Sequence, residues 1–277
     1  MRFCSFSLKG APGWGVVGPH GVGPVERWAS LRAAIAAGAL AEAAALGAEA
    51  EPIPFDAIEW LPVIPDPAKI LCVGLNYENH RKETGRAVVA NPTIFTRFAD
   101  SQTGHDAEIV LPPESDQLDY EGELAVIIGK PGRRIPASEA LDHVAGYACY
   151  NDGSVRDWQA HTIQFIPGKN WPETGAFGPW MVTPDAMGAL GPQRLRTRLN
   201  GTVMQDAALE DMIFTVPRLI EYLSTFTPLA AGDVIVSGTP GGVGVKRDPQ
   251  VFMRDGDEVE VEIDGIGVLR NRIVRRA

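Results

Sequence analysis

Hydrophobic and polar positions form short strand-length segments along most of the chain beyond residue 69, a pattern that predicts β-strands. Two of the breaks between them, Asn200-Gly201 and Asp264-Gly265, are turn sequences that favour β-hairpins. The predicted strands are Ile70–Gly74, Thr93–Phe98, Glu108–Leu111, Gly122–Gly129, Val144–Tyr150, Phe177–Val182, Leu195–Leu199, Val203–Asp206, Val234–Ser237, Glu258–Ile263 and Gly267–Val274.

Helical spacing is confined to a few segments. Apolar residues recur at i, i+3, i+4 and i+7 within Thr215–Phe226, which predicts an amphipathic helix. Shorter helices are expected at Asn76–Glu83 and Ala137–Asp142, and the alanine-rich segment Leu31–Ala48 is expected to form one helix. With so few helices to cross between strands, the pattern favours a strand-rich, mixed α+β fold over a doubly wound parallel sheet.

Residues 1–65 differ in composition from the rest, because short glycine-broken segments and the alanine-rich helix dominate there. The run "PVIPDPAKI" follows, and its prolines Pro62, Pro65 and Pro67 are typical of a linker. We therefore expect a small N-terminal α+β domain over residues 1–65 and a larger, strand-rich domain over residues 66–277.

The formal net charge of −10 argues against nucleic acid or an anionic membrane as a partner. No apolar run is long enough to span a bilayer, and the N-terminus lacks the apolar core of a signal peptide. Cys4, Cys72 and Cys149 are odd in number and far apart, which argues against a disulfide framework and for small core residues. A cytoplasmic location is therefore expected.

Acidic residues stand at the entrance of an apolar strand in "DQLDYEGELAVIIG". Side chains alternate between the faces of a strand, so Glu121 and Glu123 point the same way, and Asp119 joins them. At about 7 Å and an effective dielectric near 20, two such carboxylates repel by roughly 2 kcal/mol. Either the segment is an edge strand with an acidic face in water, or a cation offsets the repulsion.

A third acid comes from "YNDGSVRDWQ", which follows the apolar run "VAGYACY". That run is typical of a buried strand, so Asp152 is expected where the strand ends and the chain turns. Carboxylates from two strand segments are oxygen ligands of the kind that Mg²⁺ and Mn²⁺ accept. Glu121, Glu123 and Asp152 are therefore candidate ligands of one divalent cation.

Two further segments offer groups for an anion. Lys169 lies in the loop sequence "PGKNW", where it could pair with a ligand carboxylate or an oxyanion, although a single lysine is more often exposed. The sequence "VSGTPGGVG" predicts a strand that opens into a glycine-rich turn, whose N–H groups and Thr239 hydroxyl could form an anion nest. It lacks the Gly-Lys-Ser/Thr of a P-loop, so nucleotide binding is not indicated.

His80 and Glu83 are three residues apart in the predicted helix of "CVGLNYENHRKETG". Residues at i and i+3 are neighbours on a helix, so the glutamate can orient the imidazole. Such a pair can act as a general base on water. Taken alone, the same spacing is also typical of a pair on an exposed helix.

In this order, "VGLNYENHRKE", "DYEGELAVIIG", "YNDGSVRDWQ" through "GKNW", and "SGTPGGVG" resemble the motifs of the fumarylacetoacetate hydrolase family. The resemblance covers the chain from Ile70 to the C-terminus, in the branch of acylpyruvases and 2-hydroxyhepta-2,4-diene-1,7-dioate isomerases. It implies a catalytic domain folded as a mixed β-sandwich roll, a small preceding domain, and a homodimer. The sequence departs from the family pattern at Val155 and in "AFGPW", on the substrate side.

The resemblance also implies three groups of site residues in this chain, namely metal ligands, catalytic residues and substrate contacts. In that order they are Glu121, Glu123 and Asp152; His80, Glu83 and Lys169; and Arg156, Gln159 and Thr239. Asp119 matches no family ligand and is left as a flanking acid. The rest of the pocket is expected from the segments Asn76–Ala90 and Gln159–Phe177.

The reaction expected from the resemblance is hydrolysis of an acylpyruvate to pyruvate and a carboxylic acid. Mg²⁺ or Mn²⁺ would chelate the 2-oxo acid and stabilise the pyruvate enolate, and His80 with Glu83 would activate water. Decarboxylation of an oxaloacetate-like acid, or isomerisation of a muconate-type acid in aromatic catabolism, uses the same enolate, so both stay open. A non-catalytic, metal-dependent dicarboxylate binder and a metal-free acidic cluster are the remaining alternatives.

Overall fold

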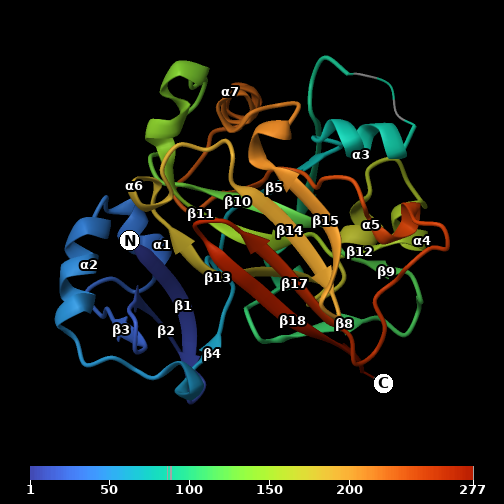
Figure 1. The fold of residues 1–277 in the computed structure, drawn as a ribbon. Helices are drawn as coiled ribbons and strands as arrows, with labels where there is room; N and C mark the ends of the chain where they lie inside the picture. Colours follow the sequence, from blue (N-terminus) through green and yellow to red (C-terminus); the bar gives the residue numbers. More distant parts are fainter. Residues whose placement is uncertain (86, 88, 277) are drawn as a thin grey trace.

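The computed structural model describes residues 1–85, 87 and 89–276 of the chain. Its strands form two large sheets that pack against each other, with helices at the edges and on the outer faces (Figure 1). Antiparallel pairs dominate, and β16 with β5, β18 with β8, and β13 with β7 are parallel. The strand-rich, mixed α+β architecture predicted from the sequence is confirmed.

In the described residues, the larger sheet has eleven strands in the order β3-β2-β1-β13-β11-β10-β16-β5-β6, with β4 paired to β1 and β7 to β13. Their bounds are β1 Arg2–Leu8, β2 Ala11–Val17, β3 Val22–Pro24, β4 Glu59–Trp60, β5 Ile70–Gly74, β6 Thr93–Arg97, β7 Gln102–Thr103, β10 Gly122–Ile128, β11 Val144–Asn151, β13 Gly175–Val182 and β16 Val234–Val236.

The second large sheet has, among the residues described, five strands in the order β15-β14-β17-β18-β8. A separate two-stranded ladder joins β12 to β9. The bounds are β8 Glu108–Leu111, β14 Arg194–Leu199, β15 Thr202–Ala208, β17 Glu258–Ile263, β18 Gly267–Arg275, β9 Leu118–Asp119 and β12 Ser154–Val155. Asn200-Gly201 connects β14 to β15 and Asp264-Gly265 lies between β17 and β18, so both predicted hairpins are confirmed.

The helices are short, and most of them lie between strands. The α-helices are α1 Leu31–Ala36, α2 Leu40–Glu49, α3 Glu78–Glu83, α4 Arg156–Gln159, α5 Ile166–Lys169, α6 Pro184–Met187 and α7 Val216–Phe226. The 3₁₀ helices are η1 Phe55–Ala57, η2 Ala99–Ser101, η3 Ala137–His143, η4 Leu209–Asp211 and η5 Gly244–Lys246.

Two of the predicted helices were wrong in detail. Leu31–Ala48 is not one helix, because Gly38 takes the left-handed conformation (φ +65°) and separates α1 from α2. The segment predicted at Ala137–Asp142 forms the 3₁₀ helix η3, since so short a segment gains little from i→i−4 hydrogen bonds. The amphipathic helix α7 is confirmed, with Leu219 and Ile220 buried in the core.

β10 is buried on both faces, and it connects the core to the acidic segment. Leu124 and Val126 pack in the cluster between the two sheets, which also takes the apolar face of α7. Ala125 and Ile127 point to the other face, where they belong to a second buried cluster that also contains Leu31 of α1. A strand covered on both sides reads as a continuous apolar run, and this explains the sequence "LAVII" after the acids.

Gly122, between the two glutamates, lies where the two sheets approach each other closely. A Cβ atom on Gly122 would lie 2.1 Å from Thr197 Oγ1 and 3.2 Å from Leu195 Cδ2, both in β14. Both atoms belong to side chains, so a larger residue fits only if these side chains of β14 move aside. The packing of the sandwich therefore favours glycine here, and Glu121 and Glu123 face away from the second sheet.

The N-terminal strands continue the large sheet. β1 pairs with β13, with Arg2 opposite Val182. Phe3 and Leu31 lie in the same core cluster as Ile127 of β10. Structurally, the first strands and α1 thus share a sheet and a core with the rest of the chain, and the division near residue 65 stays a prediction from composition.

None of the helices in the described residues is long and apolar enough to cross a membrane. Cys4, Cys72 and Cys149 are free thiols with fully buried side chains. Burial raises the pKa of each thiol, so all three are protonated, unreactive core residues, as predicted.

Candidate active site

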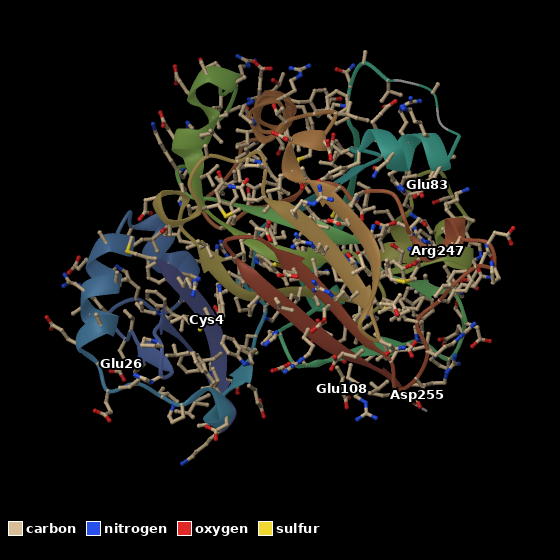
Figure 2. The ribbon with its side chains drawn as sticks, in the orientation of Figure 1. Cys4, Glu26, Glu83, Glu108, Arg247 and Asp255 are labelled. Atoms are coloured by element: carbon tan, nitrogen blue, oxygen red, sulfur yellow. The ribbon has the colours of Figure 1, made fainter. Side chains whose placement is uncertain are left out.

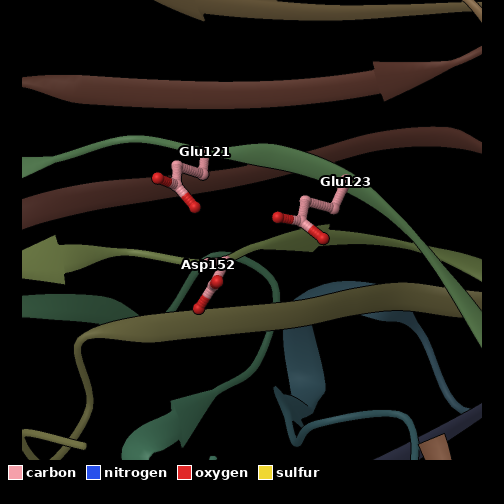
Figure 3. A group of neighbouring side chains, drawn as sticks. All are labelled: Glu121, Glu123 and Asp152. Carbon is pink, nitrogen blue, oxygen red and sulfur yellow. The ribbon is translucent and has the colours of Figure 1, made fainter. Parts of the chain in front are cut away.

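The predicted acidic triad is assembled at one end of β10. Glu121 directly precedes β10, Glu123 lies within it, and Asp152 follows β11, so the register that pairs Gly122 with Asn151 brings the three together. One carboxylate oxygen from each lies within 4.8 Å of the others, and all three residues are buried (Figure 3). The predicted common face and the position of Asp152 at a strand end are confirmed.

The charges of the triad are only partly balanced by the protein. Burial and the neighbours Asp152 and Glu121 raise the pKa of Glu123 well above its ordinary value. Burial also acts on Glu121, but Lys169 and Arg156 outweigh it and lower the pKa of that carboxyl to about 2. A divalent cation would supply the positive charge that Glu123 lacks and favour its carboxylate form, and the buried, all-oxygen set of the triad matches the ligands that such a hard cation prefers.

Lys169 lies beside the triad, where the sequence predicted it. Its Nζ is 2.7 Å from Glu121 Oε2 and 2.6 Å from Asp152 Oδ2, and the side chain is 1% exposed. Burial alone would lower the pKa of Lys169, but Asp152 and Glu121 raise it, so the amine is an ammonium. The exposed lysine considered from the sequence is therefore excluded.

Arg97, at the end of β6, is a site residue that the sequence analysis missed. Its Nη1 donates to Asp152 Oδ1 at 2.7 Å and to Gly153 O at 2.8 Å, and its Nη2 donates to Thr174 Oγ1 at 3.0 Å. The side chain has no exposed surface. A charged residue inside a predicted apolar strand was the available signal, because a buried arginine nearly always has a carboxylate partner.

Arg156 and Gln159, both in α4, were predicted to contact substrate. Arg156 Nη1 lies 2.7 Å from Glu121 Oε1 and donates to Gln159 Oε1 at 2.9 Å. Its Nη2 and Nε each lie 2.8 Å from Asp119 Oδ2. Asp119 is therefore not just a flanking acid, since it is buried and holds the guanidinium that reaches the triad.

His80 and Glu83 form the predicted pair on α3. His80 Nδ1 is 2.7 Å from Glu83 Oε1, and the imidazole is nearly buried. Glu83 Oε2 accepts the N–H of Gly242 at 2.9 Å, and Asn79 Oδ1 accepts that of Gly241 at 3.0 Å. These contacts attach α3 to the glycine-rich loop, so the pair is fixed in place, not exposed on a free helix.

In the glycine-rich loop after β16, backbone N–H groups bind carboxylates of this protein itself. Gly238 N–H donates to Glu123 Oε2, while the N–H groups of Gly244 and Val245 donate to Asp119 at 2.8 and 2.9 Å. The N–H of Gly242 donates to Glu83 of the His80–Glu83 pair. The predicted anion nest thus exists, but carboxylates of the chain occupy these donors and tie the loop to the triad.

Thr239 lies in the same loop with its hydroxyl already bonded. It donates to Gly122 O at 2.9 Å and accepts from Gln205 Nε2 at 2.8 Å. Gln205, which the sequence analysis missed, also accepts the N–H of Gly122 at 2.9 Å and so connects β15 to the loop. Binding a substrate carboxylate through this hydroxyl, as predicted, would require Thr239 to give up its bond to Gly122.

One cavity of about 520 Å³ opens at the triad. The predicted site residues that line it are His80, Glu121, Glu123, Arg156, Gln159, Lys169 and Thr239. Asp152 and Glu83 lie behind these residues, in contact with Lys169 and His80 respectively. Both segments expected to build the pocket contribute, the first through His80 and Thr84 and the second through residues 159–163, Phe165 and Lys169. Arg86 and Val88 lie outside the described residues.

The family model described as "Fumarylacetoacetate (FAA) hydrolase C-terminal" matches residues 69–274. The chain belongs to the fumarylacetoacetate hydrolase family. Human "Oxaloacetate tautomerase FAHD2A, mitochondrial" is 41% identical over 232 residues, which are 83% of this chain and 74% of the relative. The predicted family is thereby confirmed.

Solved structures of the fumarylacetoacetate hydrolase family share the whole fold. The fumarylacetoacetate hydrolase from Exiguobacterium antarcticum has a TM-score of 0.89 and 35% identity, and the alignment covers 100% of both chains. The 2-hydroxyhepta-2,4-diene-1,7-dioate isomerase from Mycobacterium marinum has a TM-score of 0.80 and 29% identity, over 100% of this chain and 99% of the other.

Members of the fumarylacetoacetate hydrolase family are enzymes that generally depend on a divalent metal, which agrees with the acidic triad. The roles assigned to the individual site residues, the homodimer and the cytoplasmic location stay predictions.

Proposed function

We propose that this family member is a divalent-metal-dependent tautomerase or isomerase, which moves a proton at the carbon next to the 2-oxo group of a dicarboxylic acid. The observation that carries the proposal is that His80, held by Glu83, lines the same cavity as Glu121 and Glu123. The names of the human and Mycobacterium marinum relatives, a tautomerase and an isomerase, support this reaction class over the hydrolysis expected from the sequence.

Glu121, Glu123 and Asp152 would hold the cation, Mg²⁺ or Mn²⁺. When bound, a divalent ion acts as a Lewis acid that polarises a 2-oxo group and makes the neighbouring C–H more acidic. Gln159 presents its amide NH₂ as a hydrogen-bond donor, because its oxygen already accepts from Arg156. A substrate carboxylate can accept from that amide group.

His80 would carry the proton. Glu83 accepts from Nδ1, so the proton of the neutral imidazole stays on that nitrogen and Nε2 is the basic atom. Nε2 can take a proton at one substrate atom and return it at another, which leaves the imidazole unchanged at the end of the cycle. Glu83 stabilises the imidazolium formed between the two steps.

Hydrolysis of an acylpyruvate is the second candidate. The same His80–Glu83 pair could deprotonate a water molecule that attacks the distal carbonyl, with Lys169 as a charge that stabilises the oxyanion. The similarity to the Exiguobacterium antarcticum fumarylacetoacetate hydrolase favours this reaction. The two candidates share the base and differ in whether a C–C bond breaks.

The test is a substrate panel with added Mg²⁺, comprising enol oxaloacetate, a muconate-type 2-hydroxydienedioate and acetylpyruvate. We expect proton transfer on the diacids and, for His80→Asn, a loss of roughly 10²- to 10⁴-fold in rate. The Mg²⁺ dissociation constant of His80→Asn should stay near the wild-type value, because His80 is not a ligand. His20→Asn, the same change at an exposed turn, should keep full activity.

Product analysis separates the alternatives. Pyruvate and acetate from acetylpyruvate would establish the hydrolase instead, and CO₂ from oxaloacetate a decarboxylase. If the diacids bind in the presence of Mg²⁺ but none of them is converted, the protein is a metal-dependent dicarboxylate binder. A collapse of Mg²⁺ affinity in His80→Asn would contradict the role given to His80.

A further inference from the structure

We propose that Lys246 forms a subsite for the distal carboxylate of the substrate, so that the enzyme selects 2-oxo acids with a second anionic group at the far end. The inference rests on the proposed function, since it assumes that a 2-oxo acid binds at the triad. The inference adds to the proposed function the residue that binds the far end of the substrate.

The charge distribution in the cavity is the first argument. Of the lysines and arginines that line it in the described part of the chain, Arg156 and Lys169 are ion-paired with the acids of the site. Lys246 also lines the cavity and is exposed, and no carboxylate of the described residues lies within ion-pair distance of it. Its ammonium charge is therefore available to a bound anion.

The backbone that carries Lys246 is fixed. The two preceding N–H groups donate to Asp119, the carboxylate that also holds Arg156. The next residue, Arg247, is bonded through its guanidinium to Tyr120 Oη and Gly242 O at 3.1 Å each, on the same side of the molecule as Glu83 (Figure 2). The loop that carries Lys246 is thus fixed by hydrogen bonds to the candidate active site, and Arg247 contributes to them.

Part of the cavity wall is apolar. Phe95, Phe165, Val73, Leu75 and Val243 line the cavity together with the charged residues. Its volume of about 520 Å³ lies in the range that encloses ligands much larger than a four-carbon acid. A substrate with its 2-oxo acid at the triad, an apolar or conjugated middle and a carboxylate at Lys246 matches this distribution.

The test compares two ligands of equal length that differ only at the far end, 2-oxoadipate and 2-oxohexanoate, by calorimetry with saturating Mg²⁺. For the wild type we expect the diacid to bind about fivefold tighter, the upper range of a partly exposed ion pair. Lys246→Met should bring the ratio close to one through weaker diacid binding, with the monoacid unaffected. Lys246→Arg should retain the preference.

The matched control is Lys82→Met, which removes the same charge from α3 near the cavity but at a residue that does not line it. Lys82→Met should keep the wild-type ratio of monoacid to diacid dissociation constants. A lower ratio in this variant would show that the positive charges attract the diacid at long range, without a contact at Lys246. A preference that survives in Lys246→Met, or a wild type that binds both acids equally or neither, would overturn the proposal. Proton transfer on the diacid is measured in a separate assay. A protein that binds the diacid more tightly through Lys246 but transfers no proton would contradict the proposed function and leave the Lys246 subsite standing.

Discussion

Asp152 shows how single residues make the acidic triad possible. Each of its carboxylate oxygens faces a buried cation, Oδ1 at 2.7 Å from Arg97 and Oδ2 at 2.6 Å from Lys169. Arg97 lies outside the cavity lining and Lys169 within it. Arg97 therefore acts through Asp152, as a residue that orients a metal ligand instead of touching the metal or the substrate.

Replacing Arg97 tests this role. Arg97→Met should weaken Mg²⁺ binding roughly 10- to 100-fold, as is usual when a partner of a metal ligand is lost. It should also lower the free energy of unfolding by about 3–5 kcal/mol, because Asp152 is left in a broken buried pair. Titration calorimetry and urea denaturation measure the two effects, and Arg97→Lys should recover part of both.

Arg218→Met is the control for arginine loss, since Arg218 pairs with Glu221 on the exposed face of α7. Arg218→Met should change the free energy of unfolding by no more than about 0.5 kcal/mol and leave the Mg²⁺ dissociation constant unchanged. An unchanged Mg²⁺ affinity in Arg97→Met would show that Arg97 has no part in orienting Asp152.

Among the elements, β10 and the glycine-rich loop do most to position the site. β10 brings two acids to its end because both of its faces are anchored in the core. The loop after β16 reaches Glu123, Glu83 and Asp119 through backbone N–H groups, so it joins the triad, the His80–Glu83 pair and the acid that holds Arg156. Backbone donors on such a loop fix carboxylates with little freedom to reorient.

Gly122→Ala tests the close approach of the sheets beside the triad. The new methyl group would overlap Thr197 Oγ1, so we expect a loss of about 1–3 kcal/mol in the free energy of unfolding. Gly191→Ala is the control, because the nearest atom to its added Cβ is 3.6 Å away and belongs to a side chain. Equal stability of the two variants in urea would mean that the sandwich can relax at this point.

At the scale of the whole molecule, the sandwich places four acids and three cations in one buried region of a chain whose net charge is −10. The four acids are Asp119, Glu121, Glu123 and Asp152, and the cations are Arg97, Arg156 and Lys169. A divalent ion would make this local charge positive and favour an anionic substrate. Metal binding should therefore stabilise the fold as well as the site.

The expected stabilisation is measurable by thermal unfolding. At a free metal concentration of 100 times the dissociation constant, the gain is about 2.7 kcal/mol, or a Tm rise of roughly 5–10 °C for a chain of this size. EDTA should reverse the shift, and Asp152→Asn should abolish most of it. No shift with either Mg²⁺ or Mn²⁺ at millimolar concentration would favour the metal-free acidic cluster.

The sequence by itself determined what depends on local pattern. The strand and helix periods gave the elements, as in β10 and α7, and placed Glu121 and Glu123 on one strand face and Asp152 at a strand end. These positions made the three acids candidate ligands of one cation. The motifs also predicted the family, which the match over residues 69–274 confirms. The elements and the position of each acid within them can be read from the chain because they depend on neighbours within a few residues. The meeting of Asp152 with the two glutamates depends on the pairing of β10 with β11.

Only the tertiary structure decided the partners of those residues. Arg97 is 55 positions from Asp152 in the chain, and Gln205 is 83 from Gly122, so no local pattern connects them. The use of the glycine-rich loop by the acids of the chain was likewise decided by tertiary contacts. Contacts between distant segments depend on how sheets and loops meet in space, and that is fixed by the summed packing of the whole chain.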